Sequence, residues 1–435
     1  MSTAECDSDI SLLRKKVDTR DLLVGMYIQE LDRPWVETPF LFQGFKIKDQ
    51  TEIRGLQELC DYVYIDLELG IDTPIEFNHA IPCRKPTTEQ LIQISSSSTR
   101  LTRISSSSAG IKAYSDTTSV EKELETAKSI YHDTHQTIGN LFSRIQSGDS
   151  ISTPEIQVVT NNVVDSVLRN PDAFMLLRKL KQKDARRFSR AVDTCALAAS
   201  FCRHLGFPED ELRIMAMGAL VLDIGTIRLP TTLLNKPGPL TPASFKLVRH
   251  HIEFGLEILK RSEDLPRVCT EMLATHHERF NGKGYPNGLK ENQIPVSGRI
   301  AAIIDCYDAM TSRRSYRKTL SPHEAICELY KWRDIDFPAE LIEQFIQCLG
   351  IYPTGTLVEL NSGQVGIILS QNRVRRLYPK LLLILNAGKE HYEKPHTLDL
   401  WEHAQKYKGK ALDIKKALDP TEVDIDPGDY YLSLD

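Results

Sequence analysis

The sequence predicts a mainly α protein, with a small β-containing domain before its helical bundle and a short β-rich extension after it. Apolar residues recur at helical spacing from about residue 119 to residue 349, which is typical of packed amphipathic helices. On both sides of this region, short apolar runs alternate with Gly, Pro and Asn, as strands and turns do. A chain of 435 residues also exceeds one ordinary core, so we expect two or three domains.

The N-terminal third is predicted to hold three segments. Residues 9–77 form the small domain, because turn residues separate several short apolar runs there. Residues 78–118 contain two runs of four serines and are expected to be a flexible linker. Residues 119–150 have helical apolar spacing, which predicts a connector made of one long helix or a helical hairpin. This connector belongs to either neighbouring domain, or it couples the two.

The bundle itself is assigned to residues 151–350. Apolar spacing predicts helices over residues 190–204, 211–222, 242–260, 263–277, 298–311 and 321–349. Breaks between helices are expected at Gly225, Pro237, Gly282 and Pro295. Residues 351–435 follow as a β-rich extension with an acidic tail, and its strands are expected over 356–360, 365–370 and 381–386.

Bulk properties exclude several classes of protein. The net charge of −5 gives no broad basic field, so a nucleic-acid polymer is not an expected partner. No apolar run reaches the ~18 residues that a membrane span needs, and the first residues lack the features of a signal peptide. The nine cysteines show no CxxC spacing, which favours free thiols in a cytoplasmic protein. Cys195, Cys202 and Cys306 have apolar neighbours and are expected in the core.

One stretch carries most of the chemical information. His276 and His277 lead into a glycine-rich loop that Gly284, Tyr285 and Pro286 close. Imidazole is a common protein ligand for zinc, iron and manganese. Glycine permits backbone turns that a residue with a Cβ avoids. The stretch therefore predicts a metal-binding or ligand-binding loop.

This stretch lies within an ordered series of matches, from about residue 170 to residue 349, that resembles the HD-GYP family. The quoted matches include Asp223-Ile224-Gly225, His251 with Gly255, Asp305, and Arg314-Ser315-Tyr316-Arg317. Members of this family hydrolyse the bacterial second messenger cyclic di-GMP. Residues of about 15 to 66 also resemble an uncharacterised domain that precedes HD-GYP domains in many bacterial proteins.

The resemblance implies an HD-type helical bundle and a specific site. In the family, water held on a cluster of two or three metals cuts a phosphodiester. Matched position by position, the metal ligands of this chain are Asp223, His251, His276, His277 and Asp305, with Asp223 also assigned a catalytic role. His250 should point elsewhere, because adjacent residues of a helix diverge by about 100°. The residues assigned to the nucleotide are Arg314, Arg317, Lys236, Gly284, Tyr285 and Pro286.

Three positions depart from the family pattern. The histidine of the family's His-Asp pair is Leu222, the histidine that opens the first ligand helix falls at Arg190, and the following lysine is Thr226. Leucine has no lone pair, and arginine stays protonated, so neither residue is an ordinary metal ligand. The chain is therefore expected to hold at most one divalent metal of iron or manganese type, or none. Arg190 is instead expected to pair with Asp223 or Asp305.

Three functions remain open from the sequence. The departures favour a degenerate phosphodiesterase domain that acts as a cyclic di-GMP receptor or regulatory scaffold, with protein partners in bacterial signalling or as a homodimer. The retained ligands favour an active, metal-dependent phosphodiesterase that gives pGpG or GMP. The third alternative is a protein-interaction module that binds no nucleotide.

Overall fold

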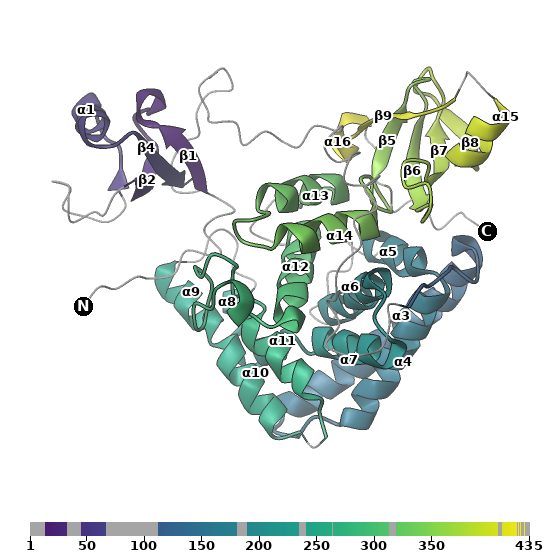
Figure 1. Cartoon of the computed structure of the whole chain (residues 1–435), viewed down its shortest axis with the longest axis horizontal. Coiled ribbons are helices and arrows are strands. Elements are labelled where there is room, and N and C mark those ends of the chain that lie inside the picture. Colours follow the sequence, from purple (N-terminus) through teal and green to yellow (C-terminus); the bar gives the residue numbers. More distant parts are fainter. Residues whose placement is uncertain are drawn as a thin grey trace. The chain divides into compact units, whose positions relative to one another are not determined.

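The structure is a computed structural model, and it describes residues 14–32, 45–66, 112–180, 189–234, 241–262, 264–312, 319–407 and 411–423, with Ile425, Pro427 and Tyr430. The chain separates into two compact units, Met1–Lys85 and Pro86–Asp435. Helices dominate the described part of the second unit, and each unit carries an antiparallel sheet (Figure 1). The predicted fold class is therefore confirmed.

Within its described residues, the first unit is a four-stranded sheet with one α-helix. Its elements are β1 (Arg14–Asp18), η2 (Thr19–Asp21), β2 (Tyr27–Leu31), β3 (Phe45–Lys46), α1 (Gln50–Leu59) and β4 (Tyr62–Asp66). The strand order is β1-β4-β2-β3, with antiparallel pairing. The Asp49 carboxylate caps α1, because it accepts hydrogen bonds from the N–H groups of Thr51 and Glu52. Ile53 and Leu56 of α1 are buried in one core with Val63 and Ile65 of β4.

The second unit begins with the helical bundle. Its elements are α3 (Val120–Gln146), α4 (Thr153–Arg169), α5 (Pro171–Leu180), α6 (Ser189–Leu205), α7 (Glu209–Leu220), η5 (Ile224–Arg228), α8 (Thr231–Leu234), α9 (Pro242–Arg249), α10 (His251–Lys260), α11 (Arg267–Thr275), η6 (Glu291–Gln293), α12 (Val296–Thr311), α13 (Pro322–Lys331) and α14 (Ala339–Leu349). Helix α6 packs against α4, α5, α7, α12 and α14. Cys195 and Cys202 of α6 are fully buried, and Cys306 of α12 is 6% exposed, as expected for core thiols.

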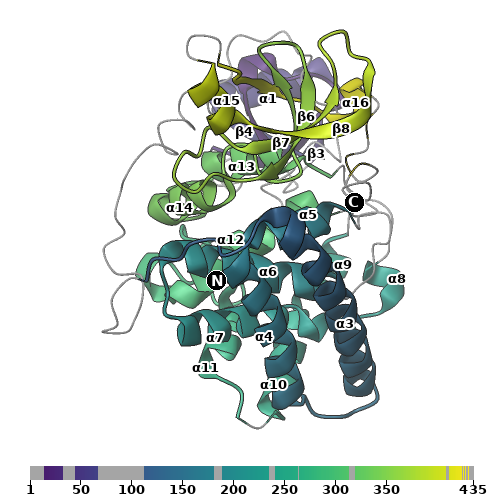
Figure 2. The ribbon, with the colours of Figure 1, turned by 90° about the vertical axis from the view of Figure 1, so that its right-hand side faces the viewer.

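The predicted connector is one helix, α3, and it packs along α4 and α5 (Figure 2). A buried carboxylate fixes this contact. Glu123, 2% exposed, accepts hydrogen bonds from Arg169 at 2.8 and 2.9 Å and another from the Ser166 hydroxyl. Charge-assisted bonds of this kind are strong when they are buried, so α3 is held as part of the bundle.

Two segments that were each predicted as one helix are two helices in the structure. The segment predicted as 242–260 divides at His250 into α9 and α10, and the segment predicted as 321–349 divides into α13 and α14. Asp334 has a positive φ of 61° and Pro338 precedes α14, so the chain turns between the second pair. His250 keeps a helix-like φ of −63°, and a one-residue break of this kind leaves the apolar spacing almost unchanged. The apolar spacing therefore does not reveal the break at His250.

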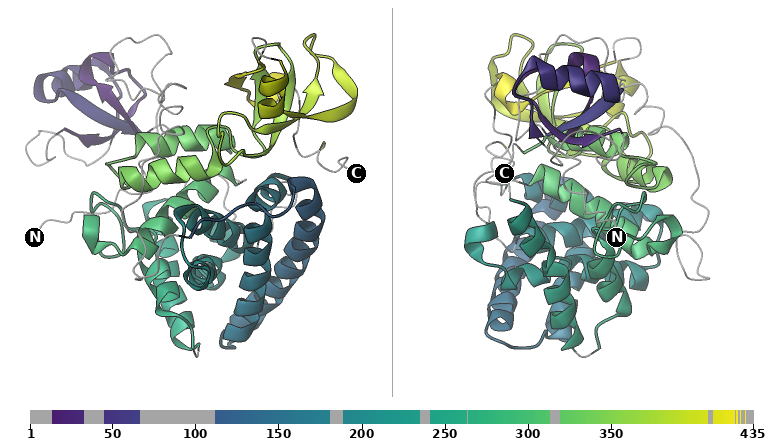
Figure 3. Two further views of the ribbon diagram at one scale, coloured as in Figure 1. Left: turned by 45° about the vertical axis from the view of Figure 1, so that its right-hand side comes forward. Right: turned by 90° about the vertical axis from the view of Figure 1, so that its left-hand side faces the viewer.

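The C-terminal extension is a five-stranded sheet at the α5 and α14 end of the bundle (Figure 3). Its elements are β5 (Leu357–Leu360), β6 (Val365–Ser370), β7 (Lys380–Leu385), β8 (His391–Asp399), α15 (Leu400–Lys406), β9 (Ile414–Ala417) and α16 (Pro420–Val423). The strand order is β8-β7-β6-β5-β9. Strands β5, β6 and β7 were predicted because their residues are almost all buried, whereas β8 and β9 lie at the edges and carry mostly partly or fully exposed residues.

Among the helices that the structure describes, none combines the length and the apolar character needed to cross a membrane.

Candidate metal centre

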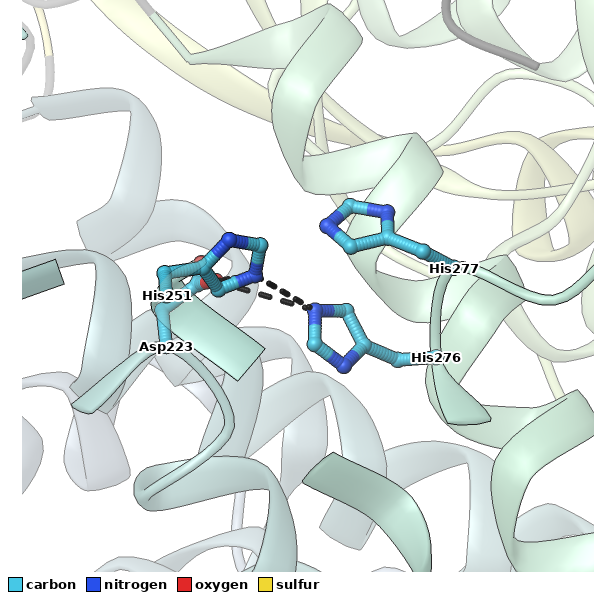
Figure 4. Close-up of side chains that lie close together, drawn as sticks. All are labelled: Asp223, His251, His276 and His277. Carbon is cyan, nitrogen blue, oxygen red and sulfur yellow. Dashed lines mark hydrogen bonds and ion pairs between the residues drawn. The ribbon is translucent and has the colours of Figure 1, made fainter. Parts of the chain in front are cut away.

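Four side chains from three distant segments converge in the second unit. Asp223 lies between α7 and η5, His251 begins α10, and His276 and His277 follow α11. One ligand atom from each residue lies within 4.8 Å of those of the other three (Figure 4). We call these four residues the histidine cluster.

Two glycines allow η5 and α10 to approach closely enough to form the histidine cluster. A Cβ on Gly225 would lie 1.8 Å from the carbonyl oxygen of His251 and 2.5 Å from the backbone nitrogen of Gly255. Both distances are shorter than any stable contact, and both atoms belong to the backbone. Only glycine therefore fits at position 225, and this places Asp223 beside His251.

The hydrogen bonds of two imidazoles fix which nitrogen faces the centre. Nδ1 of His251 donates to the carbonyl of Val248 at 2.8 Å, and Nδ1 of His276 donates to the carbonyl of Leu273 at 2.8 Å. In neutral rings each Nε2 then carries a lone pair, because a carbonyl can only accept. Backbone acceptors of this kind commonly orient metal-binding histidines.

The atoms at the centre are all rich in electrons. The two Nε2 atoms are 3.4 Å apart, and Oδ1 of Asp223 lies 3.5 Å from Nε2 of His251 and 3.7 Å from Nε2 of His276. Facing lone pairs repel one another unless a cation or a proton lies between them. Three imidazoles and one carboxylate suit a divalent metal of iron, manganese or zinc type. The donor set thus fits a metal ion.

His277 is held by the loop that closes with Tyr285 and Pro286. The ring of Tyr285 stacks on the imidazole of His277, with centroids 4.5 Å apart, and the N–H of Tyr285 donates to the carbonyl of His277 at 3.1 Å. Nδ1 of His277 is buried without a hydrogen-bond partner and lies 4.0 Å from Oδ2 of Asp305. The loop therefore orients the fourth side chain of the histidine cluster.

A single guanidinium occupies the other side of Asp223. Nη1 of Arg190 lies 3.0 Å from Oδ2 of Asp223, Nη2 contacts Oδ1 of Asp305, and Nε lies 3.3 Å from Oδ2 of Asp308. The structure thus brings Arg190 to both carboxylates that the sequence named for it, and Asp305 faces Arg190 as well as His277. The same guanidinium also reaches a third carboxylate.

Asp308 is a site residue that sequence reasoning missed. It is fully buried, and it also binds Arg178 at 2.8 Å. The available signal was its spacing from Asp305, because residues three apart on a helix share a face. Asp308 therefore belongs to the same charged group as Asp305.

The other two departures have local roles. Leu222 is 2% exposed and contributes to the apolar core. The hydroxyl of Thr226 donates to the carbonyl of Asp223 at 2.7 Å, which supports the turn into η5. Leu222 lacks the lone pair of the family's histidine, and Thr226 lacks the positive charge of the family's lysine.

The loop after His277 is anchored by Glu278, which sequence reasoning also missed. Its two carboxylate oxygens accept hydrogen bonds from the N–H groups of Asn287 at 2.7 Å and Leu289 at 2.9 Å. A Cβ on Gly284 would lie 2.4 Å from Cα of Glu278, so this turn requires glycine. Arg314, Arg317 and Lys236, which the sequence assigned to the nucleotide, lie outside the residues that the structure describes.

His250 lies apart from the histidine cluster, as expected. Its Nδ1 pairs with Glu253 at 2.7 Å on the outer side of α10, and the side chain is 40% exposed. This residue is therefore a suitable control for substitutions of its neighbour His251.

Burial and charge shift the pKa values at the centre. Burial opposes ionisation of Asp223, but Arg190, followed by the neighbouring imidazoles, holds the pKa of this carboxyl well below its usual range. Burial lowers the pKa of His251, although the Asp223 carboxylate opposes this shift. Burial, followed by the nearby His276, holds the pKa of His277 well below its usual range. Both His251 and His277 are consequently neutral at physiological pH, as metal ligands must be.

These shifts predict that the metal-free protein is destabilised by acid. Because the two pKa values are lowered on folding, the unfolded chain takes up protons first as the pH falls through about 6.5. Stability is then fully present above about pH 6.5, and each histidine removes up to about 1.4 kcal/mol per pH unit below it. Urea unfolding of chelator-treated protein, measured across this range, would show the loss.

Matched glutamine substitutions assign the acid effect. His277→Gln should flatten the dependence on pH, and His250→Gln is the matched control because its side chain lies outside the histidine cluster and is 40% exposed. Equal stability of the wild type at about pH 7 and about pH 5 would contradict this account.

The chain is similar to known domains and proteins over most of its length. The HD domain model matches residues 175–337, and the model of a domain of unknown function (DUF3391) matches residues 14–156. A Pseudomonas aeruginosa protein named cyclic di-GMP phosphodiesterase is 30% identical over 375 residues, which cover 86% of each chain. A Thermotoga maritima cyclic di-GMP phosphodiesterase is 38% identical over 152 residues, or 35% of this chain and 41% of its own.

Two further similarities are to a protein whose name gives another substrate and to a solved structure of low sequence identity. A Vibrio cholerae protein named 3'3'-cGAMP-specific phosphodiesterase 2 is 35% identical over 189 residues, 43% of this chain and 36% of its own. Among solved structures, an HDG"Y"P protein from Bdellovibrio bacteriovorus matches with a TM-score of 0.44 and 14% identity, over 76% of this chain and 98% of its own.

Proposed function

Because the chain belongs to the HD-GYP family, we propose that it is a cyclic di-GMP signalling protein with a degenerate phosphodiesterase site. In this proposal it acts as a nucleotide receptor or regulatory scaffold and hydrolyses the nucleotide poorly or not at all. The observation that carries the proposal is Arg190, whose guanidinium lies against Asp223, Asp305 and Asp308.

The guanidinium replaces part of what a metal would do. In the family, the histidines that correspond to Arg190 and Leu222 serve largely the same metal. Arg190 supplies one positive charge there, which neutralises carboxylates and can donate hydrogen bonds to a phosphate. A guanidinium stays protonated and offers no vacant site for water, so it cannot generate hydroxide.

The histidine cluster is proposed to hold at most one divalent metal, of iron or manganese type. Asp223, His251, His276 and His277 would be its ligands. When bound, such a metal lowers the pKa of a water molecule and neutralises phosphate charge. The residues assigned to the nucleotide are Arg314, Arg317 and Lys236, together with the loop Gly284, Tyr285 and Pro286.

An active phosphodiesterase is the second candidate function. It is favoured by the orientation of His251 and His276, whose Nδ1 atoms donate to carbonyls and leave both Nε2 lone pairs for a metal. One metal would then support hydrolysis of cyclic di-GMP to pGpG or GMP. The similarity to a Vibrio cholerae phosphodiesterase named as specific for 3'3'-cGAMP makes this dinucleotide a second substrate to test.

One set of measurements on a single sample separates these functions. The protein, purified under reducing conditions with manganese or iron(II), is assayed for metal content, for binding of both cyclic dinucleotides and for their hydrolysis. We expect no more than one metal per chain, cyclic di-GMP binding and no turnover. Turnover that His276→Ala abolishes and His250→Ala preserves would overturn the receptor proposal in favour of the enzyme. Failure of the wild type to bind either dinucleotide would instead indicate a protein-interaction module.

A further inference from the structure

The imidazole of His277 is held differently from the other two imidazoles of the histidine cluster. His251 and His276 are each oriented by a hydrogen bond of 2.8 Å from Nδ1 to a backbone carbonyl. Nδ1 of His277 is buried, and no described residue forms a hydrogen bond with it. Figure 4 shows the His277 ring turned toward the other members of the cluster. Its orientation therefore depends on packing, and the ring of Tyr285 supplies the stacked contact.

The ring of Tyr285 is enclosed between two groups. His277 stacks on it, with ring centroids 4.5 Å apart and planes 20° from parallel. The guanidinium carbon of Arg249 lies 4.4 Å from the centroid of the same tyrosine ring. An aromatic ring has two faces, so the guanidinium lies over the face that His277 leaves open, and Tyr285 is only 2% exposed. We call Arg249, Tyr285 and His277 the arginine–tyrosine–histidine stack.

Helix α9 supplies two contacts to Tyr285. Besides Arg249, Phe245 meets the edge of the tyrosine ring, with centroids 6.2 Å apart and planes at 80°. Phe245 and Arg249 are four residues apart on α9 and therefore share a face of the helix. Helix α9 ends at Arg249, and His251 begins α10 two residues later. The break at His250 consequently allows the chain to cover Tyr285 with one helix and to begin the next helix with a member of the histidine cluster.

The contact of Arg249 with Tyr285 is a cation–π interaction, in which the electron-rich face of the ring attracts the positive charge. The side chain of Arg249 is half-buried, and among the described residues no carboxylate pairs with it. Replacing Arg249 by a neutral residue therefore leaves no buried carboxylate without a counterion, and we expect the fold to tolerate the change.

We propose that Arg249 is a positioning residue of the candidate metal centre and acts through Tyr285 on His277. The guanidinium holds the tyrosine ring against the imidazole, and the stacked ring keeps the imidazole turned toward the position of the metal. Groups that orient a metal ligand contribute to metal affinity although they do not touch the metal. This inference rests on the metal binding proposed for the histidine cluster.

Titration of the full chain with cobalt(II) tests the proposal, because the visible spectrum of this ion depends on the geometry of its ligands. Arg249→Met removes the charge but keeps an unbranched side chain. We expect it to weaken cobalt(II) affinity by about three- to tenfold, measured by competition with a chelator, and to shift the visible absorption bands. Arg249→Lys keeps a cation that can lie over the ring, so it should restore both the affinity and the spectrum.

Arg375→Met is the matched control. The guanidinium carbon of Arg375 also lies 4.4 Å from the centroid of an aromatic ring, that of Trp401, but neither residue belongs to the histidine cluster. This variant should keep the affinity and the spectrum of the wild type. Wild-type affinity and spectrum in Arg249→Met would overturn the proposal. A loss in Arg249→Met that Arg249→Lys fails to restore would also overturn it, because the charge would then not be what matters.

A double-mutant cycle tests the route through Tyr285. Tyr285→Leu should weaken cobalt(II) affinity by about 10–100-fold, since it removes the ring that stacks on His277. In the Tyr285→Leu background, Arg249→Met should have no further effect, because the ring that it acts on is gone. Equal losses from Arg249→Met in both backgrounds would show that Arg249 does not act through Tyr285, against the proposal.

Hydrogen exchange of the metal-free protein separates this proposal from the proposed metal binding. The N–H of Tyr285 donates to the carbonyl of His277 at 3.1 Å, so its exchange rate reports how firmly the loop is held. If the wild type binds no cobalt(II), the metal-binding proposal fails. Faster exchange of this amide in Arg249→Met, but not in Arg375→Met, would still support the role of Arg249 in holding Tyr285 against His277. Unchanged exchange in Arg249→Met would contradict that role.

Discussion

The double substitution Arg190→His and Leu222→His is expected to raise the bound metal from at most one ion to at least two per chain, and to increase hydrolysis of cyclic di-GMP at least ~100-fold. Arg190 lies against Asp223, Asp305 and Asp308, so its removal frees carboxylates while the new imidazoles supply lone pairs. The magnitude takes the upper end of the about 10–100-fold cost of losing outer partners of a metal ligand, because here two ligands themselves are restored.

The single substitution Leu222→His tests whether the added histidine is enough without removal of Arg190. Leu222→His alone should gain little metal, since the Arg190 cation would still lie between the carboxylates. Metal content by mass spectrometry and initial rates under reducing conditions give both readouts, and a melting curve checks that a polar residue at the buried position 222 is tolerated. Unchanged metal content and rate in the folded double variant would refute the role assigned to Arg190.

Gly225→Ala is expected to destabilise the protein by about 3 kcal/mol or more and to abolish metal binding. The added Cβ would lie 1.8 Å from the carbonyl oxygen of His251, and this backbone atom cannot rotate away as a side chain would. Relief of the overlap requires η5 to move away from α10, which separates Asp223 from His251. Urea unfolding and metal content measure the two effects.

Gly148→Ala provides the matched glycine control. Gly148 has a φ of 108°, so alanine is strained there, but nothing lies within 4 Å of the added Cβ. We expect a cost of about 1–3 kcal/mol from strain alone and no change in metal binding. Equal metal content in the two variants would mean that the contact between Gly225 and His251 does not shape the centre.

The sequence predicted the fold class and the four members of the histidine cluster, because an ordered series of motifs carries that information. The two α6 thiols and Cys306 were also placed correctly in the core. Edge strands β8 and β9 were missed, since their exposed residues give no apolar run. The break at His250 was missed because a helix-like residue there preserves the apolar period.

The contacts of Arg190 with the carboxylates around it could be predicted only in part from the sequence. Arg190 was identified as a departure from the family pattern, and its pairing with Asp223 or Asp305 was expected from charge. Asp308 was missed although its spacing from Asp305 is visible in the sequence, because only the fold places its carboxylate between Arg178 of α5 and Arg190 of α6.

The guanidinium of Arg190 is joined covalently to the chain. The positive charge that it supplies therefore does not depend on how much transition metal the cell contains. A ferrous ion can be chelated, exchanged or oxidised, whereas an arginine side chain cannot be removed by any of these routes. The carboxylates of Asp223, Asp305 and Asp308 are therefore neutralised in part even in a cell starved of iron. We expect this half of the centre to keep its shape during iron limitation or oxidative stress, when a bound metal ion would be lost.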